Sequence, residues 1–176
     1  MRDSQDRDGN LKSLKARELG EICCRGLAVY AGYHDNPDAT EEAMEAGWFH
    51  TGDLGYVDER GLVYITGRSS DMYISGGANV YPREIEEVLL THPGVSEVAV
   101  FGVPDEKWGE TGVAIVVRNS NTEIADEADL YQHLEGRCAR YRWPSRFFFW
   151  DAMPKSGYGK IVKKDFREIL KNQGML

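Results

Sequence analysis

The stretch PREIEEVLLTHPGVSEVAVF, residues 82–101, decides the fold, because its pattern changes abruptly from that of a helix to that of a strand. Pro82 suits the first turn of a helix. The apolar residues that follow recur at the i, i+3, i+4 spacing of one helical face: Ile85, Val88 and Leu89. Pro93-Gly94 ends this helix. The apolar run after it, Val95–Phe101, is typical of a strand.

The sequence around this stretch continues the alternation. Before it, Met72–Ile74 predicts a short strand. After it, two strands and two helices are predicted in the order strand, helix, strand, helix: Val113–Val117, Asp126–Cys138, Arg146–Trp150 and Lys163–Leu170. Residues 67–176 are therefore expected to form an α+β domain, in which helices pack on a small sheet.

Residues 1–66 have a different pattern, that of a small β-rich lobe. Its predicted elements are a strand region, a short helix and a hairpin: Glu21–Tyr30, Ala39–Ala46 and Tyr56–Thr66. Gly47 is a candidate C-cap of the short helix. The polar junction Gly67–Asp71 is the predicted boundary between the two domains.

Composition and charge exclude several classes of function. Of the 176 residues, 41% are hydrophobic, enough for a core, and the net charge of −8 argues against broad contact with a nucleic-acid backbone. No apolar run approaches the ~18–20 residues that span a bilayer. The charged N-terminal segment MRDSQDRDGNLKSLKAREL has no apolar core of a signal peptide. These features predict a cytoplasmic protein.

The cysteines and histidines do not have the spacing of a metal site. The cysteines are odd in number and lack the pattern of a zinc site or a disulfide framework: Cys23, Cys24 and Cys138. The histidines are far apart: His34, His50, His92 and His133. Reduced thiols and no metal site are therefore expected. His92 precedes Pro93-Gly94, which favours a role at the end of the helix.

Three polar clusters interrupt the apolar elements. In His50–Leu54, Asp53 offers a carboxylate that could accept two hydrogen bonds from a vicinal diol such as a ribose, although an Asp after Gly is also a common turn residue. Arg68 at a strand end could bind phosphate or ribose oxygens, or form an exposed salt bridge. The glycines of Ser75-Gly76-Gly77 are expected to form a flexible loop that could hinge or line a narrow channel.

The third cluster, Pro154–Lys160, carries two glycines and ends on a lysine. The ammonium group of Lys160 could neutralise charge that develops on phosphate or carboxylate oxygens. The alternative is a hairpin turn with surface lysines. The cluster is not a P-loop, because Ile161 stands where that motif has Ser or Thr.

Taken together and in order, these clusters resemble the closing motifs of the adenylate-forming enzymes: acyl-CoA synthetases, luciferases and peptide-synthetase adenylation domains. The resemblance rests on FHTGDLGYVDERGLVYITGRSSDMYISGGANVYPREIEEVLL, residues 49–90, and PKSGYGKIVKKDFREIL, residues 154–170. It extends over residues 20–170. The variant SGGANVYP is most similar to fatty-acid and aromatic-acid CoA ligases.

The resemblance implies a two-step reaction. A carboxylate attacks the α-phosphate of ATP, with Mg²⁺, to give an acyl-adenylate, and the thiol of coenzyme A then displaces AMP. By motif position, Asp53 would hold the ribose hydroxyls and Arg68 would contact the ribose and phosphate. Lys160 would bridge the carboxylate and phosphate oxygens in the first step. In the second step, a channel for coenzyme A would be lined by these residues: Ser75, Gly76, Gly77 and Trp108.

The resemblance also implies a rotation of the C-terminal domain, called the lid, between the two steps. The hinge falls on Ser70, where family members usually carry Asp or Lys. Residues 1–66 correspond to the last lobe of the family's large N-terminal domain and residues 67–176 to the complete lid. The phosphate-binding loop, the magnesium ligands and most of the acyl pocket belong to the part that is not matched.

Three interpretations of function follow. The first is the C-terminal portion of an acyl-CoA ligase that is inactive alone. The second is a non-catalytic interaction module with the lid fold. The third is a lid that acts in trans with a separate N-terminal adenylation domain. Since residues 21–66 would normally pack against the large domain that is not matched, their apolar surface is expected to be exposed and to favour self-association.

Overall fold

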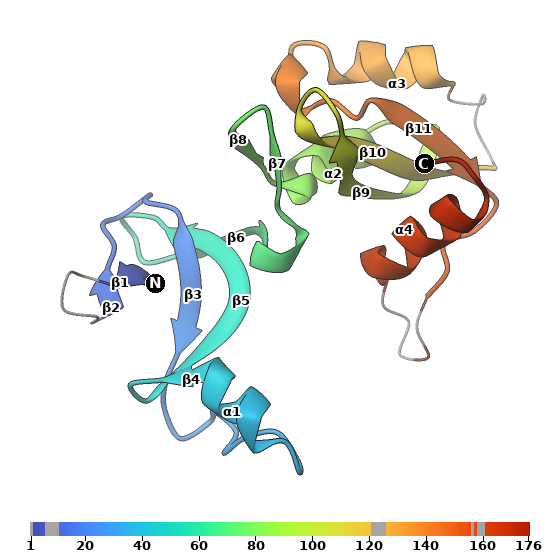
Figure 1. Cartoon of the computed structure of the whole chain (residues 1–176). Coiled ribbons are helices and arrows are strands. Elements are labelled where there is room, and N and C mark those ends of the chain that lie inside the picture. Colours follow the sequence, from blue (N-terminus) through green and yellow to red (C-terminus); the bar gives the residue numbers. More distant parts are fainter. Residues whose placement is uncertain (1, 6–10, 121–125, 156, 158–160) are drawn as a thin grey trace. The chain divides into compact units, whose positions relative to one another are not determined.

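The chain consists of two compact units, Met1–Ser70 and Asp71–Leu176, each with its own sheet (Figure 1). The computed structural model describes every residue outside a few short gaps: 1, 6–10, 121–125, 156 and 158–160. Among the helices of the described residues, none has the length and apolar character needed to cross a membrane.

The first unit is mainly β-structure. Its elements are β1 (Arg2–Gln5), β2 (Leu11–Ser13), β3 (Gly20–Cys24), α1 (Pro37–Ala43), β4 (Met44–Glu45), β5 (Trp48–Val57) and β6 (Val63–Arg68). The strands form one sheet in the order β2-β1-β3-β5-β4, and β6 also pairs with β5. All of these pairs are antiparallel, and the long strand β5 connects three of the others.

Two predicted elements of this unit have different limits in the structure. Of the predicted strand region, only its start is a strand, as β3, and the helix is shifted toward the N-terminus. Helix α1 begins at Pro37 because the side chain of Asn36 accepts a hydrogen bond from the Ala39 amide and caps the helix. It ends at Ala43, since the chain then enters β4, so Gly47 is not its C-cap. With φ of 76°, Gly47 lies in the turn between β4 and β5.

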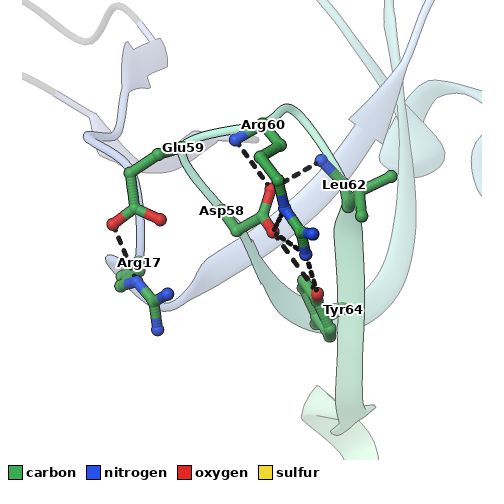
Figure 2. Close-up of polar contacts among 6 residues, drawn as sticks. All are labelled: Arg17, Asp58, Glu59, Arg60, Leu62 and Tyr64. Carbon is green, nitrogen blue, oxygen red and sulfur yellow. Dashed lines mark hydrogen bonds and ion pairs between the residues drawn. The ribbon is translucent and has the colours of Figure 1, made fainter.

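The predicted hairpin at the end of this unit is confirmed as β5 and β6, and a buried carboxylate organises its turn. Figure 2 shows Asp58 accepting hydrogen bonds from the amides of Arg60 and Leu62, at 2.9 Å each, and from the Arg60 guanidinium. The Leu62 hydrogen bond is the main cause that lowers the pKa of Asp58, with the Arg60 side chain contributing in the same direction. Asp58 therefore remains ionised in the fold at neutral pH.

The second unit contains the α+β domain. Its elements are β7 (Tyr73–Ser75), β8 (Ala78–Val80), α2 (Pro82–Leu90), β9 (Val95–Asp105), β10 (Gly109–Arg118), α3 (Glu127–Leu134), β11 (Arg146–Trp150) and α4 (Lys163–Asn172). The sheet runs β11-β10-β7-β8, and β9 also pairs with β10. The β10–β11 pair is parallel, and the other pairs are antiparallel.

Helices cover both faces of this sheet, with α2 and α3 on one side and α4 on the other (Figure 1). The strands therefore bury both sets of alternating side chains, which explains their continuous apolar runs. Side chains on the α2–α3 side include Val98, Val100, Ala114 and Val116. Those on the α4 side include Ala99, Phe101, Val113 and Ile115. The α+β prediction is confirmed.

Two details of the second unit differ from expectation. The strand β8 was not predicted. Helix α3 ends at Leu134 rather than at Cys138, because the chain is extended at Glu135 and then turns at Gly136, where φ is 72°. Cys138 instead packs, partly buried, at the edge of the α2–α3 core.

Candidate functional site

Asp53 and Arg68 are paired across the β5–β6 hairpin. They are direct partners in the strand register, and the Arg68 Nε atom donates to Asp53 Oδ1 at 2.9 Å. Arg68 also donates to the carbonyl of Thr51 at 3.2 Å. Both side chains are accessible, with 60% of the arginine and 33% of the aspartate side chain exposed. Because a carboxylate has about four lone-pair positions, Asp53 can accept further hydrogen bonds from a ligand.

The backbone before Asp53 forms an irregularity within β5, where its register with β3 shifts. Gly52 has φ of 72°, a conformation that favours glycine. Its amide donates to Glu21 on the neighbouring strand β3 at 2.9 Å, and its carbonyl accepts from Ser69 Oγ. The Thr51 hydroxyl donates to the carbonyl of Ile22 and accepts from the Asp53 amide. The position of the Asp53 carboxylate is therefore set by its own and the adjacent strands.

The segment Ser75-Gly76-Gly77 is a tight hairpin turn and not the flexible loop that was expected. Ser75 pairs with Ala78 across the β7–β8 hairpin, so the two glycines are its entire turn. Both have positive φ, 56° and 82°, as a type I′ turn requires. The Gly76 amide is fixed further by a hydrogen bond to the Trp108 carbonyl at 2.9 Å.

The structure brings Trp108 against this turn. A Cβ atom added to Gly76 would lie 2.8 Å from Trp108 Cε3, so only glycine fits beside the ring. The indole is about half exposed. Its backbone is held by Asp105, whose carboxylate accepts hydrogen bonds from the amides of Lys107 and Trp108. Trp108 and the two glycines thus form one contiguous surface feature.

The start of this hairpin is anchored in the core by Tyr73. Its side chain is almost fully buried and packs against two glycines of the central strands, Gly102 on β9 and Gly112 on β10. A Cβ atom at either glycine would lie within 2.4 Å of the tyrosine. Burial raises the pKa of Tyr73 far above its usual value, so the ring stays neutral.

Lys160, the predicted catalytic lysine, lies outside the described residues. The residues on either side of this segment are described: Lys155 and Ile161 form an antiparallel β-bridge. Lys155 is also paired with Glu97 on β9, with 2.7 Å between Nζ and Oε2. The described residues that flank Lys160 on both sides are therefore paired with each other, and Lys155 is also tied to β9.

Lys163, at the start of α4, joins this segment to the rest of the second unit. Its Nζ atom lies 2.7 Å from Glu86 on α2 and 3.5 Å from Asp71. The Glu86 carboxylate also accepts a hydrogen bond from the Val100 amide of β9. Asp71 directly follows Ser70, the predicted hinge residue, which lies in a short 3-10 turn between the units.

Spacing along the sequence missed one cluster of potential ligands in the first unit. Glu21, Cys23 and His50 offer a carboxylate oxygen, a thiol sulfur and an imidazole nitrogen that all lie within 4.8 Å of one another. The signal was present only in the pairing of strands: Cys23 on β3 lies opposite His50 on β5. His92, by contrast, acts at the end of α2 as expected, since its Nδ1 accepts a hydrogen bond from the Gly94 amide.

Comparison with known proteins identifies what the chain resembles. Residues 84–160 match the family of AMP-binding enzyme C-terminal domains. A 2-succinylbenzoate–CoA ligase of Bacillus cereus is 42% identical over 86% of this chain and 31% of its own length. A long-chain fatty-acid–CoA ligase of Mycobacterium tuberculosis is 46% identical over 85% of this chain and 29% of its own.

Solved structures give the same result. The o-succinylbenzoate CoA synthetase of Bacillus subtilis, in complex with an acyl-adenylate intermediate, aligns with a TM-score of 0.83 and 37% identity over 93% of this chain. ATP-bound MatB of Rhodopseudomonas palustris aligns with a TM-score of 0.83 and 40% identity over 97%. In both cases 33% of the other chain is covered, so this chain spans about a third of the length of the proteins that it matches.

Proposed function

Because this chain belongs to the adenylate-forming enzymes and matches the C-terminal part of their acyl-CoA ligases, we propose that it supplies the lid and adjoining lobe of an ATP-dependent acyl-CoA ligase. In this proposal residues 1–66 are the last lobe of the adenylation domain and residues 67–176 are the lid. The reaction joins a carboxylic acid to coenzyme A through an acyl-adenylate. The relatives act on aromatic and fatty acids, and the same classes are proposed as substrates here.

The observation that carries the proposal is the Asp53–Arg68 pair at the position of the ribose-binding motif. The carboxylate is partly exposed and held by a strand register, and it retains lone pairs for the two hydroxyls of a ribose. Arg68 offers further N–H groups toward ribose or phosphate oxygens. A preformed acceptor and donor side by side suit a neutral diol joined to an anionic phosphate.

In the first step, the ammonium group of Lys160 neutralises the charge that builds up as the carboxylate oxygen attacks the α-phosphate and pyrophosphate leaves. Its contribution depends on position, because it acts on groups that other parts of the enzyme hold. Contacts of the described flanking residues support this role: Lys155 and Ile161 pair with each other, and Lys163 is tied to Glu86 on α2.

In the second step, the thiol of coenzyme A attacks the acyl carbonyl and AMP leaves. The rigid Gly76-Gly77 turn with Trp108 provides a surface without side chains next to an aromatic ring, which suits the passage of a narrow pantetheine chain. The two steps use different faces of the lid, and rotation about Ser70 exchanges them in this proposal.

Mg²⁺ would accompany ATP in the first step and would supply charge neutralisation at the phosphates. Hard oxygen ligands suit this ion. The described cluster of donor groups, Glu21, Cys23 and His50, contains a thiol and an imidazole and does not fit Mg²⁺. The proposal therefore assigns the magnesium ligands to the remaining two thirds of the enzyme.

The test is an ATP–pyrophosphate exchange assay in two settings. Residues 1–176 alone are expected to give no exchange with a panel of fatty and aromatic acids. Fused to the matching N-terminal two thirds of the Bacillus subtilis o-succinylbenzoate CoA synthetase, they are expected to restore exchange. In the fusion, Lys160→Ala should abolish exchange, whereas Lys171→Ala, which removes an exposed lysine near the end of α4, should retain most of it.

The outcomes separate the alternatives. Exchange by residues 1–176 alone would overturn the assignment of a dependent part. Restoration by an N-terminal part added as a separate polypeptide would favour a lid that acts in trans. A folded but inactive fusion that still captures nucleotide would leave an interaction module as the better account. Asp53→Asn should weaken nucleotide binding in the active fusion, measured as a rise in KM for ATP.

A further inference from the structure

Three metal-binding types of side chain meet on one face of the first unit's sheet. Glu21 and Cys23 are two residues apart on β3 and therefore point to the same face. His50 on β5 is the direct register partner of Cys23, so its side chain lies on that face as well. Cys24, the next residue along β3, belongs to the opposite face and is exposed.

The distances are close to those of a tetrahedral site. Cys23 Sγ lies 3.7 Å from His50 Nδ1. Two ligands bound to one zinc ion at about 2.3 Å for sulfur and about 2.05 Å for nitrogen would be about 3.6 Å apart at the tetrahedral angle. Glu21 Oε2 lies 2.7 Å from the same Nδ1 atom, where the two share a hydrogen bond. An ion between them would replace that hydrogen bond and widen the separation to about 3.4 Å.

Two of the three side chains already have the supporting contacts that metal ligands need. With Nδ1 facing the other donors, His50 Nε2 is buried and has no hydrogen-bond partner among the described residues, but Glu45 Oε2 lies 3.5 Å away. A histidine ligand ordinarily donates its second ring N–H to a carboxylate, and Glu45 would accept it after a small movement of its side chain. The Oε1 atom of Glu21 accepts a hydrogen bond from the Gly52 amide at 2.9 Å, so the Oε2 atom is the one that faces the cluster.

We propose that Glu21, Cys23 and His50 bind a thiophilic divalent cation, with Zn²⁺ as the best match, and that a water molecule completes four-coordination. A thiolate and an imidazole select borderline and soft ions over Mg²⁺ and Ca²⁺. Binding takes Cys23 as the thiolate, and its proton passes to solvent. Cys23 is buried and the cluster lies among acidic side chains, which suits a dipositive ion.

The site joins β3 to β5 immediately before the segment Thr51-Gly52-Asp53, where the register of the two strands shifts. Glu21 takes part in both, because one of its oxygens holds Gly52 and the other faces the cluster. The ion therefore has a structural role here: it ties the two strands that position Asp53. This inference does not depend on the proposed ligase reaction.

The test uses Co²⁺ as a spectroscopic substitute for Zn²⁺. Purified reduced protein, residues 1–176, is titrated with Co²⁺ under anaerobic conditions while the near-ultraviolet and visible absorption is recorded. A sulfur-to-cobalt charge-transfer band that saturates at one equivalent is expected, together with visible bands of tetrahedral cobalt. Zn²⁺ should abolish both, and Mg²⁺ in large excess should not.

Three variants assign the ligands. Cys23→Ser should remove the charge-transfer band, and His50→Gln should weaken Co²⁺ binding at least tenfold. Cys24→Ser is the matched control and should leave the titration unchanged. Circular dichroism checks that each variant is folded. If Cys23→Ser does not fold, the proposal is tested by the His50→Gln titration and by the rise in melting temperature that Zn²⁺ causes in the wild type. No band in the wild type, or a band that survives in Cys23→Ser but not in Cys24→Ser, would overturn the proposal.

Discussion

Replacing Gly76 by alanine tests the contact between the β7–β8 turn and Trp108. The new methyl group has two separate costs. A non-glycine residue in the left-handed region destabilises the fold by about 1–2 kcal/mol. Because alanine has less conformational freedom than glycine in the unfolded chain, about 0.5–1 kcal/mol of this cost is offset. The second cost comes from the Cβ atom, 2.8 Å from Trp108 Cε3, well inside ordinary contact.

The two costs can be separated by a matched control. Gly77 also has positive φ, but a Cβ atom there would meet nothing within 4 Å, so Gly77→Ala reports the backbone cost alone, about 1 kcal/mol. Overpacking against the ring adds a further cost to Gly76→Ala, about 1 kcal/mol at the lower end of the usual range, because Trp108 is half exposed and can shift. We expect a total of about 2 kcal/mol.

The assay is urea unfolding of the second unit, followed by tryptophan fluorescence. Trp48 is the tryptophan of the first unit, so a Trp48→Phe background leaves reporters in the second unit alone, chiefly Trp143 and Trp150. In a Trp108→Ala background the extra cost of Gly76→Ala should disappear, a coupling of about 1 kcal/mol. A coupling below about 0.4 kcal/mol would mean that the ring does not restrict this turn, and the reasoning would fail.

Three further predictions concern charged groups. Glu86→Ala removes the partner of Lys163 and of a backbone amide, and should destabilise the second unit by about 2 kcal/mol in urea unfolding; Glu87→Ala, an exposed control, should cost less than about 0.5 kcal/mol. Burial lowers the pKa of His133, so the contribution of this residue to stability is complete above pH ~6.5 and declines as the pH falls toward the lowered pKa. His133→Gln should therefore flatten the dependence of the urea midpoint on pH between pH 5 and 8, and the same pH dependence in wild type and variant would contradict this. The pKa of Asp58 is lowered, chiefly by the Leu62 amide, so the contribution of Asp58 to stability is present above pH ~4 and is lost as the pH falls through the folded-state pKa. Asp58→Asn should lower the melting temperature at pH 7 and make the melting temperature less sensitive to acid. An unchanged melting curve would show that the carboxylate is dispensable.

The periodic elements could be predicted from sequence because each depends on local spacing. Helix α2 and strands β9 and β10 agree with their apolar patterns, since both faces of the central strands and one face of the helix are buried. The ends were less predictable. Helix α3 stops four residues early because the chain is extended at Glu135 and then turns at Gly136, although Cys138 still has helical spacing.

The site could be predicted only in part, because its geometry depends on pairing between distant residues. The motifs located Asp53 and Arg68, but not that strand register pairs them with each other. Gly76-Gly77 were expected to be flexible, although a Gly-Gly pair between short strands also fits a two-residue hairpin. The cluster joins His50 to Cys23 and Glu21, which lie 27 and 29 positions before it, and no local spacing can reveal this.

The sheet of the second unit also implies an order of assembly during folding. β9 and β10 are joined by a three-residue turn and pair along their whole length, whereas β11 reaches the other edge of β10 only after a long crossover through α3. Local hairpins form within microseconds, and contacts that close long loops form later. We therefore expect the hairpin to be present in the transition state and β11 to dock after it, so that Phe147→Leu accelerates unfolding while the refolding rate stays nearly constant.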